Sequence, residues 1–169
     1  MPSAALARTS GAREDANRLL WLELGNYAAL PSAHAEADRR QAVADLLADN
    51  HFAPHGLEDG PYGLHLAVRE GRLVFDIRDA NGRPLHALVL AMGPLRGLIK
   101  DYHMVVASHE QVVAEGGHEA RVQAIDMGRR GLHNEGAELL MARLDGRVAL
   151  DFETARRLFT LVCALHQRI

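Results

Sequence analysis

Residues 64–91 contain three short segments in which large apolar side chains alternate with polar or small ones. The pairs Glu70-Gly71 and Asn81-Gly82 separate these segments, and glycine supplies the positive φ that tight hairpin turns require. The pattern predicts a three-stranded β-meander whose last strand covers residues 84–91. It constrains the fold strongly, because other elements must cover the apolar face of such a sheet. That face carries Leu64, Leu66, Val68, Leu73, Phe75 and Ile77.

A two-residue turn at Glu70-Gly71 would fix the register of the first two strands of the meander. In that register Leu66 faces Phe75, and His65 faces Asp76 on the side of the sheet opposite the main core. One interpretation of the His65–Asp76 pair is an imidazole oriented for proton transfer. The other is a modest cross-strand contact.

Further elements are expected on both sides of the meander. Residues 18–24 predict a strand with Leu20, Leu22 and Leu24 on one face. Residues 50–63 read as a loop, and residues 147–150 as a short extended piece. Helices are predicted at residues 31–49, 94–115, 119–144 and 151–167, with Ser32 and Asp151 as N-caps.

These elements define the expected fold class and domain organisation. We expect an α+β fold, in which an antiparallel sheet of about four strands packs against about four helices. The sheet would comprise the N-terminal strand and the meander. Residues 1–16, which are small and polar, are expected to form a disordered tail, and residues 17–169 a single domain. The helix at 94–115 has a broad apolar stripe consisting of Leu95, Leu98, Ile99, Tyr102, Val105, Val106, His109, Val112 and Val113.

Composition narrows the class of protein. A chain of 169 residues with 48% hydrophobic residues suits one packed domain, and no apolar run reaches the length of a membrane span. The first residues lack a basic region followed by a long apolar stretch, so a cytoplasmic location is expected. The single cysteine, Cys163, excludes an internal disulfide and any multi-cysteine zinc or iron–sulfur site. We also expect no other metal site and no cofactor. The net charge of −3 disfavours a globally basic nucleic-acid binder.

Residues 124–136 stand out because Gly128, Gly131 and Gly136 interrupt a helical pattern. Each glycine costs about 1 kcal/mol relative to alanine in a helix, so some other interaction should offset these costs. One explanation is close approach of another helix, with the C-terminal helix as the expected neighbour. The alternatives are a helix break near Gly131 and a ligand that approaches the backbone.

A charged face lies on the same segment. On a continuous helix Asp126, Arg130 and His133 share one side, because their spacings are four and three residues. One interpretation is a site that grips an anion through guanidinium groups, with histidine and asparagine as further donors. The other is an exposed helix face with an ordinary ion pair between Asp126 and Arg130. The predicted site consists of Asp126, Arg129, Arg130, His133, Asn134, Glu135, Arg156 and Arg157.

Several longer strings resemble an uncharacterised bacterial protein family, number 0262 of the UPF series. The resemblance covers roughly residues 18–167 and implies a small cytoplasmic bacterial protein, without assigning catalytic residues. The strings are Gly60-Pro61-Tyr62, Leu64-His65-Leu66, residues 73–78, Ile99-Lys100-Asp101-Tyr102, residues 124–140 and residues 154–161.

Three functional hypotheses follow from these residues. The first is a non-catalytic binding or regulatory protein that recognises an anionic small molecule, an RNA phosphate or an acidic protein surface. The second is a small enzyme acting on a phosphorylated substrate, with His133 or the His65–Asp76 pair as its acid–base group. The third is a homo-oligomeric scaffold that uses the second face of the sheet, which carries Ala67, Val74, Ala87 and Val89.

Overall fold

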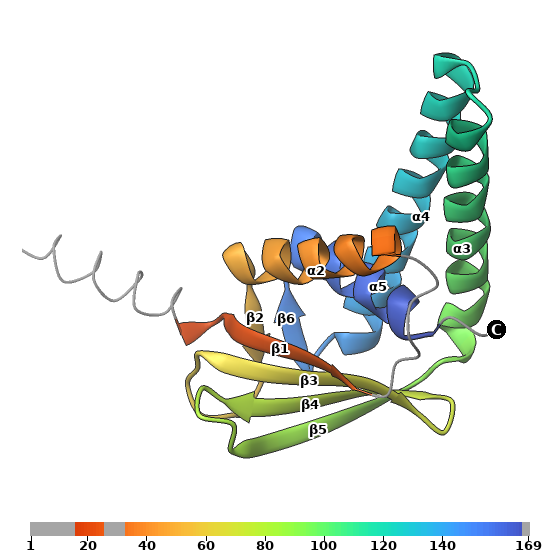
Figure 1. The fold of residues 1–169 in the computed structure, drawn as a ribbon. Coiled ribbons are helices and arrows are strands. Elements are labelled where there is room, and N and C mark those ends of the chain that lie inside the picture. The colour runs from red at the N-terminus through yellow and green to blue at the C-terminus, as the bar shows by residue number, and fades with distance from the viewer. Residues whose placement is uncertain (1–15, 26–32, 167–169) are drawn as a thin grey trace, which may run out of the picture.

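The predicted meander is confirmed by strands β3 (Tyr62–Arg69), β4 (Arg72–Asp79) and β5 (Pro84–Ala91), which pair in antiparallel fashion. A fourth strand, β1 (Leu19–Gly25), joins the other side of β3, so the order is β1-β3-β4-β5 (Figure 1). The computed structural model describes residues 16–25 and 33–166. Most of the expected N-terminal tail and the expected cap Ser32 therefore lie outside the described residues.

The register between β3 and β4 is the one that the turn predicts. Leu66 pairs with Phe75 and His65 with Asp76. Glu70 and Gly71 both have positive φ angles, 51° and 71°. This left-handed conformation matches the twist of a two-residue hairpin, which explains why the register could be predicted from the turn.

Strand β1 differs from the prediction in two respects. It runs parallel to β3, because the chain passes through a helix and a short strand before it re-enters the sheet. The predicted grouping of Leu20, Leu22 and Leu24 on one face is wrong, because the register shifts between Leu19 and Trp21. Leu19 is buried and Leu20 is 45% exposed. An irregularity of this kind re-aims a side chain without changing the hydrophobic composition of the strand.

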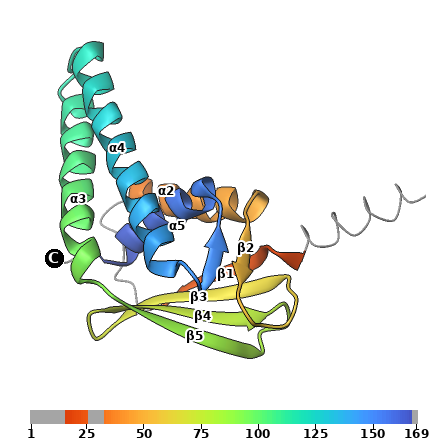
Figure 2. The same ribbon diagram turned by 180° about the vertical axis from the view of Figure 1, so that it is seen from behind.

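Four described helices cover one face of the sheet and leave the other face without a helix (Figures 1 and 2). None of the described helices combines the length and apolarity needed to cross a membrane. Helices α3 and α4 form a hairpin that projects beyond the sheet (Figure 1). Val113, predicted in the apolar stripe of α3, is 55% exposed, since only two helices pack together in the outer part of the hairpin. The helices are α2 (Ala33–Ala48), α3 (Gly93–Ala114), α4 (Glu119–Leu144) and α5 (Phe152–Leu165).

A second, two-stranded sheet pairs β2 (Phe52–Pro54) with β6 (Val148–Leu150). The prediction of a loop over residues 50–63 is wrong for β2, whereas the extended piece at residues 147–150 is confirmed. Phe52 pairs with Leu150 and is fully buried. Burial of this ring between distant segments explains why three residues suffice to form the strand.

Helix α5 lies within the core and joins the two sheets to the helical layer. The predicted cap is confirmed, since Asp151 Oδ1 accepts a hydrogen bond from the backbone N–H of Thr154 at 2.8 Å. The buried hydroxyl of Thr154 accepts a hydrogen bond from the backbone N–H of His51 at 2.9 Å. Cys163 is also buried, and burial raises the pKa of its thiol well above the usual value. The cysteine therefore remains a protonated core residue.

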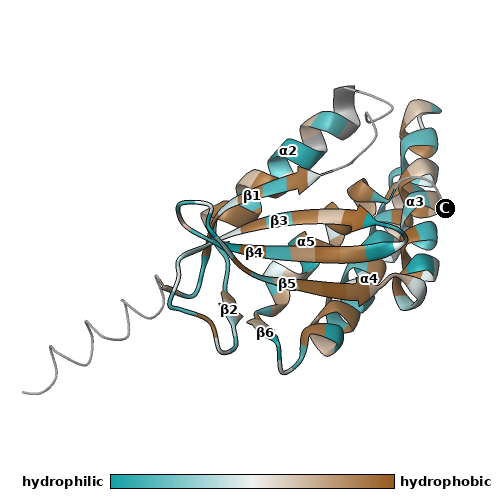
Figure 3. Ribbon diagram, turned by 90° about the horizontal axis from the view of Figure 1, so that it is seen from below, coloured by the Kyte–Doolittle hydropathy of each residue, from teal (hydrophilic) through white to brown (hydrophobic). Residues whose placement is uncertain are grey.

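The outer face of the main sheet carries Ala67, Val74, Ala87 and Val89 in the predicted positions. Figure 3 views the sheet from this side, and no described helix covers it. Val89 is 47% exposed. The described helices all occupy the opposite layer and leave this face uncovered.

Candidate functional site

Helix α4 continues without interruption from Glu119 to Leu144, so the break considered near Gly131 does not occur. The continuous helix places Asp126, Arg129 and Arg130 within contact distance. Asp126 Oδ1 accepts a hydrogen bond from Arg129 at 2.7 Å, and Asp126 Oδ2 lies 3.1 Å from Arg130 Nε. Burial raises the pKa of Asp126, but Arg129 and Arg130 lower it further, so the net pKa lies below its ordinary value. The carboxylate is therefore ionised between its two arginines.

The glycines of α4 have two different surroundings. A Cβ atom on Gly136 would overlap with the ring of Phe159 in α5, so this glycine allows the close helix contact that the sequence predicted. At Gly128 and Gly131, no described atom beyond the adjoining residues and the nearby helix backbone lies within 4 Å of the position that a Cβ would occupy. Packing therefore explains Gly136 but leaves Gly128 and Gly131 without a packing role.

His133 lies one turn before Gly136 and is enclosed by neighbours from α3 and α5. Its Nε2 is 3.0 Å from the hydroxyl oxygen of Thr160, and its ring centre is 5.0 Å from that of Tyr102. Burial, followed by the charges of Arg156 and Arg129, lowers the pKa of His133 from 6.5 to about 4. The imidazole is therefore neutral at pH 7.

Arg156 of α5 lies close enough to His133 to help lower the pKa of the imidazole. Its guanidinium Nη1 lies 3.1 Å from Glu153 Oε1. The Nε atoms of Arg129 and Arg156 are buried and have no hydrogen-bond acceptor among the described residues. We call Asp126, Arg129, Arg130, His133 and Arg156 the arginine cluster. Its three arginines face two carboxylates, those of Asp126 and Glu153, which leaves an excess positive charge.

The remaining predicted site residues lie elsewhere. Arg157 donates a hydrogen bond to the backbone carbonyl of Asp49 at 2.8 Å, so it ties α5 to the end of α2. Asn134 and Glu135 are exposed on other sides of α4. The structure thus brings together five of the eight predicted residues, four through their spacing on α4 and Arg156 through the packing of α5 against α4. Thr160 and Tyr102, which enclose His133, were missed as site residues because nothing in their local sequence distinguishes them from core positions.

The second predicted catalytic group, His65 with Asp76, is aligned in register but not joined by a hydrogen bond among the described contacts. The carboxylate of Asp76 is bound instead by Arg78, at 2.8 Å and 3.1 Å. The Nε2 atom of His65 lies 4.0 Å from Glu23 Oε2. Arg78 thus takes the place beside Asp76 that an acid–base pair would need for His65.

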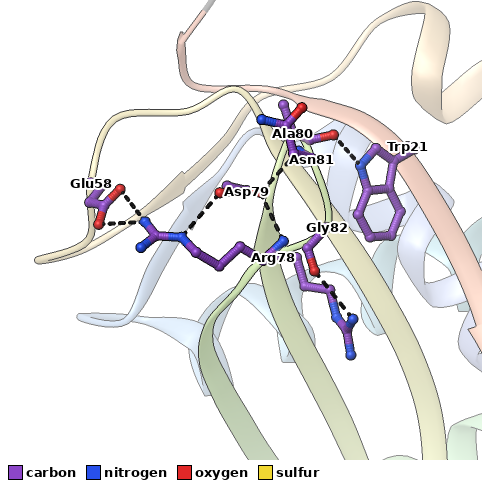
Figure 4. Close-up of polar contacts among 8 residues, drawn as sticks. Trp21, Glu58, Arg78, Asp79, Ala80, Asn81 and Gly82 are labelled. Carbon is purple, nitrogen blue, oxygen red and sulfur yellow. Dashed lines mark hydrogen bonds and ion pairs between the residues drawn. The ribbon is translucent and has the colours of Figure 1, made fainter.

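A polar network that the sequence did not suggest holds the turn between β4 and β5 (Figure 4). Arg83 contacts both carboxylate oxygens of Glu58 at 2.7 Å and Asp79 at 3.3 Å. The indole N–H of Trp21 donates to the carbonyl of Ala80 at 3.2 Å. Backbone N–H groups, that of Arg83 first, lower the pKa of Asp79 below its ordinary value. These contacts join the loop before β3 and the strand β1 to one turn, so we interpret the network as structural.

A cavity of about 400 Å³ opens at the far edge of the main sheet. One wall is formed by residues 86–89 of β5, and the other by His55, Gly146 and Arg147. None of the predicted site residues lines this cavity. The arginine cluster and the cavity are thus separate features of the molecule.

Comparison with known proteins places the chain among proteins without an assigned activity. The sequence profile described as "Uncharacterised protein family (UPF0262)" matches residues 16–168. A UPF0262 protein of Acidiphilium cryptum is 65% identical over 133 residues, which cover 79% of this chain and 82% of the relative. A UPF0262 protein of Granulibacter bethesdensis is 61% identical over 142 residues, covering 79% and 80%. A UPF0262 protein of Maricaulis maris is 48% identical over 153 residues, covering 90% and 95%. No solved structure matches the chain.

Proposed function

The chain belongs to the uncharacterised protein family UPF0262, whose members' names assign no activity, and from its own geometry we propose that it is a non-catalytic binding protein of the cytoplasm. In this proposal the arginine cluster holds an anionic group of the partner. The partner's group would be a carboxylate or a phosphate, the two anions that guanidinium groups bind in a bidentate manner.

The observation that carries the proposal is the pair of buried Nε–H groups on Arg129 and Arg156, for which the described part of the chain offers no acceptor. Buried polar groups in native proteins almost always have a hydrogen-bond partner, so a buried donor without one calls for an explanation. An anion placed beside His133 would supply acceptors to both guanidinium groups. It would also offset the repulsion between the arginines, which Asp126 and Glu153 only partly neutralise.

The low pKa and the hydrogen bond of His133 favour a binding protein over an enzyme. An efficient general acid or base has a pKa near the working pH, whereas the pKa of His133 is about 4. Its Nε2 atom is also engaged with the Thr160 hydroxyl. We therefore propose that His133 packs between Thr160 and Tyr102 as a neutral ring and contributes no proton transfer.

Affinity capture from a native extract tests this proposal, with mass analysis of the proteins and the small molecules that are retained. The test variant is Arg129→Gln combined with Arg156→Gln, which removes both unpartnered Nε–H groups. Arg121→Gln is the matched control, because Arg121 is exposed near the start of the same helix and makes no ion pair with a described residue. We expect the wild type and the control to retain the same partner and the double variant to lose it.

The thermal midpoint of each variant, followed by circular dichroism, separates binding from folding. A double variant that keeps its fold and still retains every partner would contradict the proposal. If the double variant unfolds, Arg130→Gln replaces it, because the Arg130 side chain is 69% exposed and contacts only Asp126 among the described carboxylates. Undiminished capture by that variant would also count against the cluster as the binding surface.

A further inference from the structure

Strand β5 forms an open edge of the main sheet, because it pairs with β4 on one side and with no described strand on the other. The opposite edge is closed locally by Asn50. Its side chain accepts from the backbone N–H of Leu19 at 2.8 Å and donates to the carbonyl of Leu19 at 3.1 Å. Of the two edges, β5 is therefore the one available for a further strand.

The register identifies the backbone groups at this open edge. In a two-residue hairpin the flanking residues Arg69 and Arg72 exchange hydrogen bonds, so every second residue of β4 from Arg72 onward points its N–H and C=O towards β3. The intervening residues point towards β5 and pair with Leu90, Leu88 and His86. The N–H and C=O groups of Ala87, Val89 and Ala91 therefore point away from β4.

The sequence of β5 lacks the usual protection of an edge strand. Natural edges are blunted by charged side chains, by proline within the strand or by a covering element. In Pro84–Ala91 the proline stands at the first position, and no Lys, Arg, Asp or Glu follows it. The ribbon of β5 is mostly hydrophobic in Figure 3, and Val89 is 47% exposed. An edge of this composition suits pairing with another strand.

The cavity of about 400 Å³ gives this edge a second wall with a defined charge. Arg147 is exposed and makes no ion pair with any described residue. Its backbone is fixed on both sides, since its N–H donates to the Leu144 carbonyl at 2.9 Å and its carbonyl accepts from His55 at 2.8 Å. The unpaired guanidinium group therefore projects from a rigid turn beside the open strand, with His55 and His86 as neighbours along the cavity.

We propose that the groove between β5 and the His55–Arg147 wall binds an extended, acidic segment of a partner protein as a fifth strand of the main sheet. The backbone of the segment pairs with Ala87, Val89 and Ala91. Alternate side chains of an extended chain point to opposite faces, so its carboxylates face Arg147 while its apolar side chains lie beside Val89. This surface is distinct from the arginine cluster, and the inference does not depend on the function proposed above.

A second copy of this chain fits the groove less well than an acidic segment. Antiparallel pairing of two β5 strands requires a two-fold axis perpendicular to the sheet, which puts both helical layers on the same side. The two His55–Arg147 walls would then meet at the new strand pair. Two unpaired arginines and four histidines would gather there without a carboxylate partner, whereas an acidic segment supplies the missing negative charge.

Selection from a phage-displayed library of random linear peptides tests the proposal with the full chain as bait and the Val89→Pro variant as counter-selection. Proline at this position removes an outward N–H and leaves the ladder between β4 and β5 intact. We expect enriched peptides to alternate acidic with β-branched or aromatic residues.

Fluorescence anisotropy of an enriched, labelled peptide then gives its affinity for each variant. We expect Val89→Lys and Arg147→Glu each to weaken peptide binding by about tenfold or more. The affinity of the wild-type chain for the peptide should also fall at high salt.

Arg121→Glu is the matched control for Arg147→Glu, since it makes the same charge change on an exposed helix of the hairpin. The control and the Arg129→Gln/Arg156→Gln variant should bind the peptide as the wild type does. Three results would overturn the proposal. In the first, selection on the wild-type chain enriches no peptide relative to selection on Val89→Pro. In the second, the enriched peptides bind Arg147→Glu as tightly as they bind the wild type. In the third, sedimentation equilibrium shows a dimer of the wild-type chain that Val89→Lys dissociates. Val89→Lys, with its exposed position, also replaces Val89→Pro as counter-selection if the proline variant does not fold.

Discussion

Gly136 of α4 lies directly against the ring of Phe159 in α5, at a point where a Cβ atom would overlap with that ring. Phe159 is fully buried, so this contact is part of the core. It also positions the candidate site. One turn before Gly136, His133 reaches Thr160, which follows Phe159 directly in the chain. The close approach of α4 and α5 therefore brings Arg129 of one helix and Arg156 of the other near one imidazole, whose pKa both arginines lower.

The first prediction concerns this helix contact. Gly136→Ala should lower the free energy of unfolding by about 1–3 kcal/mol, because the added methyl group overpacks the core. Gly131→Ala is the control on the same helix, where the position is open and alanine should stabilise by about 1 kcal/mol. Urea denaturation of both variants measures the difference. If Gly136→Ala is as stable as Gly131→Ala, the close approach of α4 and α5 is wrong.

The elements that the sequence predicted well are those whose geometry depends on near neighbours. The turn at Glu70-Gly71 sets the register of β3 and β4, and Asp151 caps α5 through the residue three positions later. Pairing of Phe52 with Leu150 depends instead on two segments that are far apart in the chain. Neither segment is long enough to show a periodic pattern, so the sequence indicated an extended piece at residues 147–150 but not β2 or its pairing with β6.

The same distinction explains the candidate site. Helical spacing predicted that Asp126, Arg130 and His133 share one side of α4. It could not show that Arg156 approaches the imidazole while Arg157, its neighbour in sequence, binds the carbonyl of Asp49. The groove beside β5 was also out of reach, because its second wall combines residues that follow β2 with residues that precede β6.

The second prediction uses Trp21, which is the only tryptophan of the chain. A Cβ atom on Gly63 would overlap with the indole, so Gly63→Ala should displace the ring and break its hydrogen bond to the Ala80 carbonyl. We expect a red-shifted fluorescence emission and a loss of about 1–3 kcal/mol in stability. Gly97→Ala is the control, because its position in α3 is open. An unchanged emission spectrum in Gly63→Ala would contradict this packing.

The third prediction concerns the closed edge of the sheet at Asn50. Its side chain makes three hydrogen bonds, to the N–H and C=O of Leu19 and to the carbonyl of Leu46. Asn50→Ala should cost about 2–3 kcal/mol, because partly buried backbone groups lose their partners. Asn50→Asp keeps the acceptor for Leu19 but sets a carboxylate against two carbonyl oxygens. Its stability should therefore improve as the pH falls and the carboxyl group takes up a proton. A loss below about 0.5 kcal/mol in Asn50→Ala would mean that water replaces these bonds fully.

The fourth prediction follows from the pKa of His133, which is about 4 in the folded chain and near 6.5 when unfolded. Between these values the unfolded chain binds a proton that the folded chain does not. Stability from this group is therefore complete above about pH 6.5 and decreases as the pH falls towards 4. Allowing for partial exposure of the imidazole, the decrease should be about 2 kcal/mol.

Urea denaturation at several pH values measures this effect, with His133→Gln as the comparison. The pKa of His166 is also lowered by burial and contributes in the same direction, so the difference between wild type and variant isolates His133. We expect that difference to shrink as the pH falls. Parallel pH profiles for the two proteins would show that the imidazole is not shielded as described.

The last prediction tests the arginine cluster with sulfate. An anion that binds only the folded chain stabilises it by mass action, so sulfate should raise the thermal midpoint more than chloride at equal ionic strength. Sulfate also stabilises proteins generally by exclusion from their surface, and this part must be the same in every variant. The specific part requires the unpartnered Nε–H groups of Arg129 and Arg156. Arg129→Gln/Arg156→Gln should therefore gain less from sulfate than the wild type, whereas Arg121→Gln should gain as much. Equal gains in all three proteins would show that these two Nε–H groups do not form an anion site.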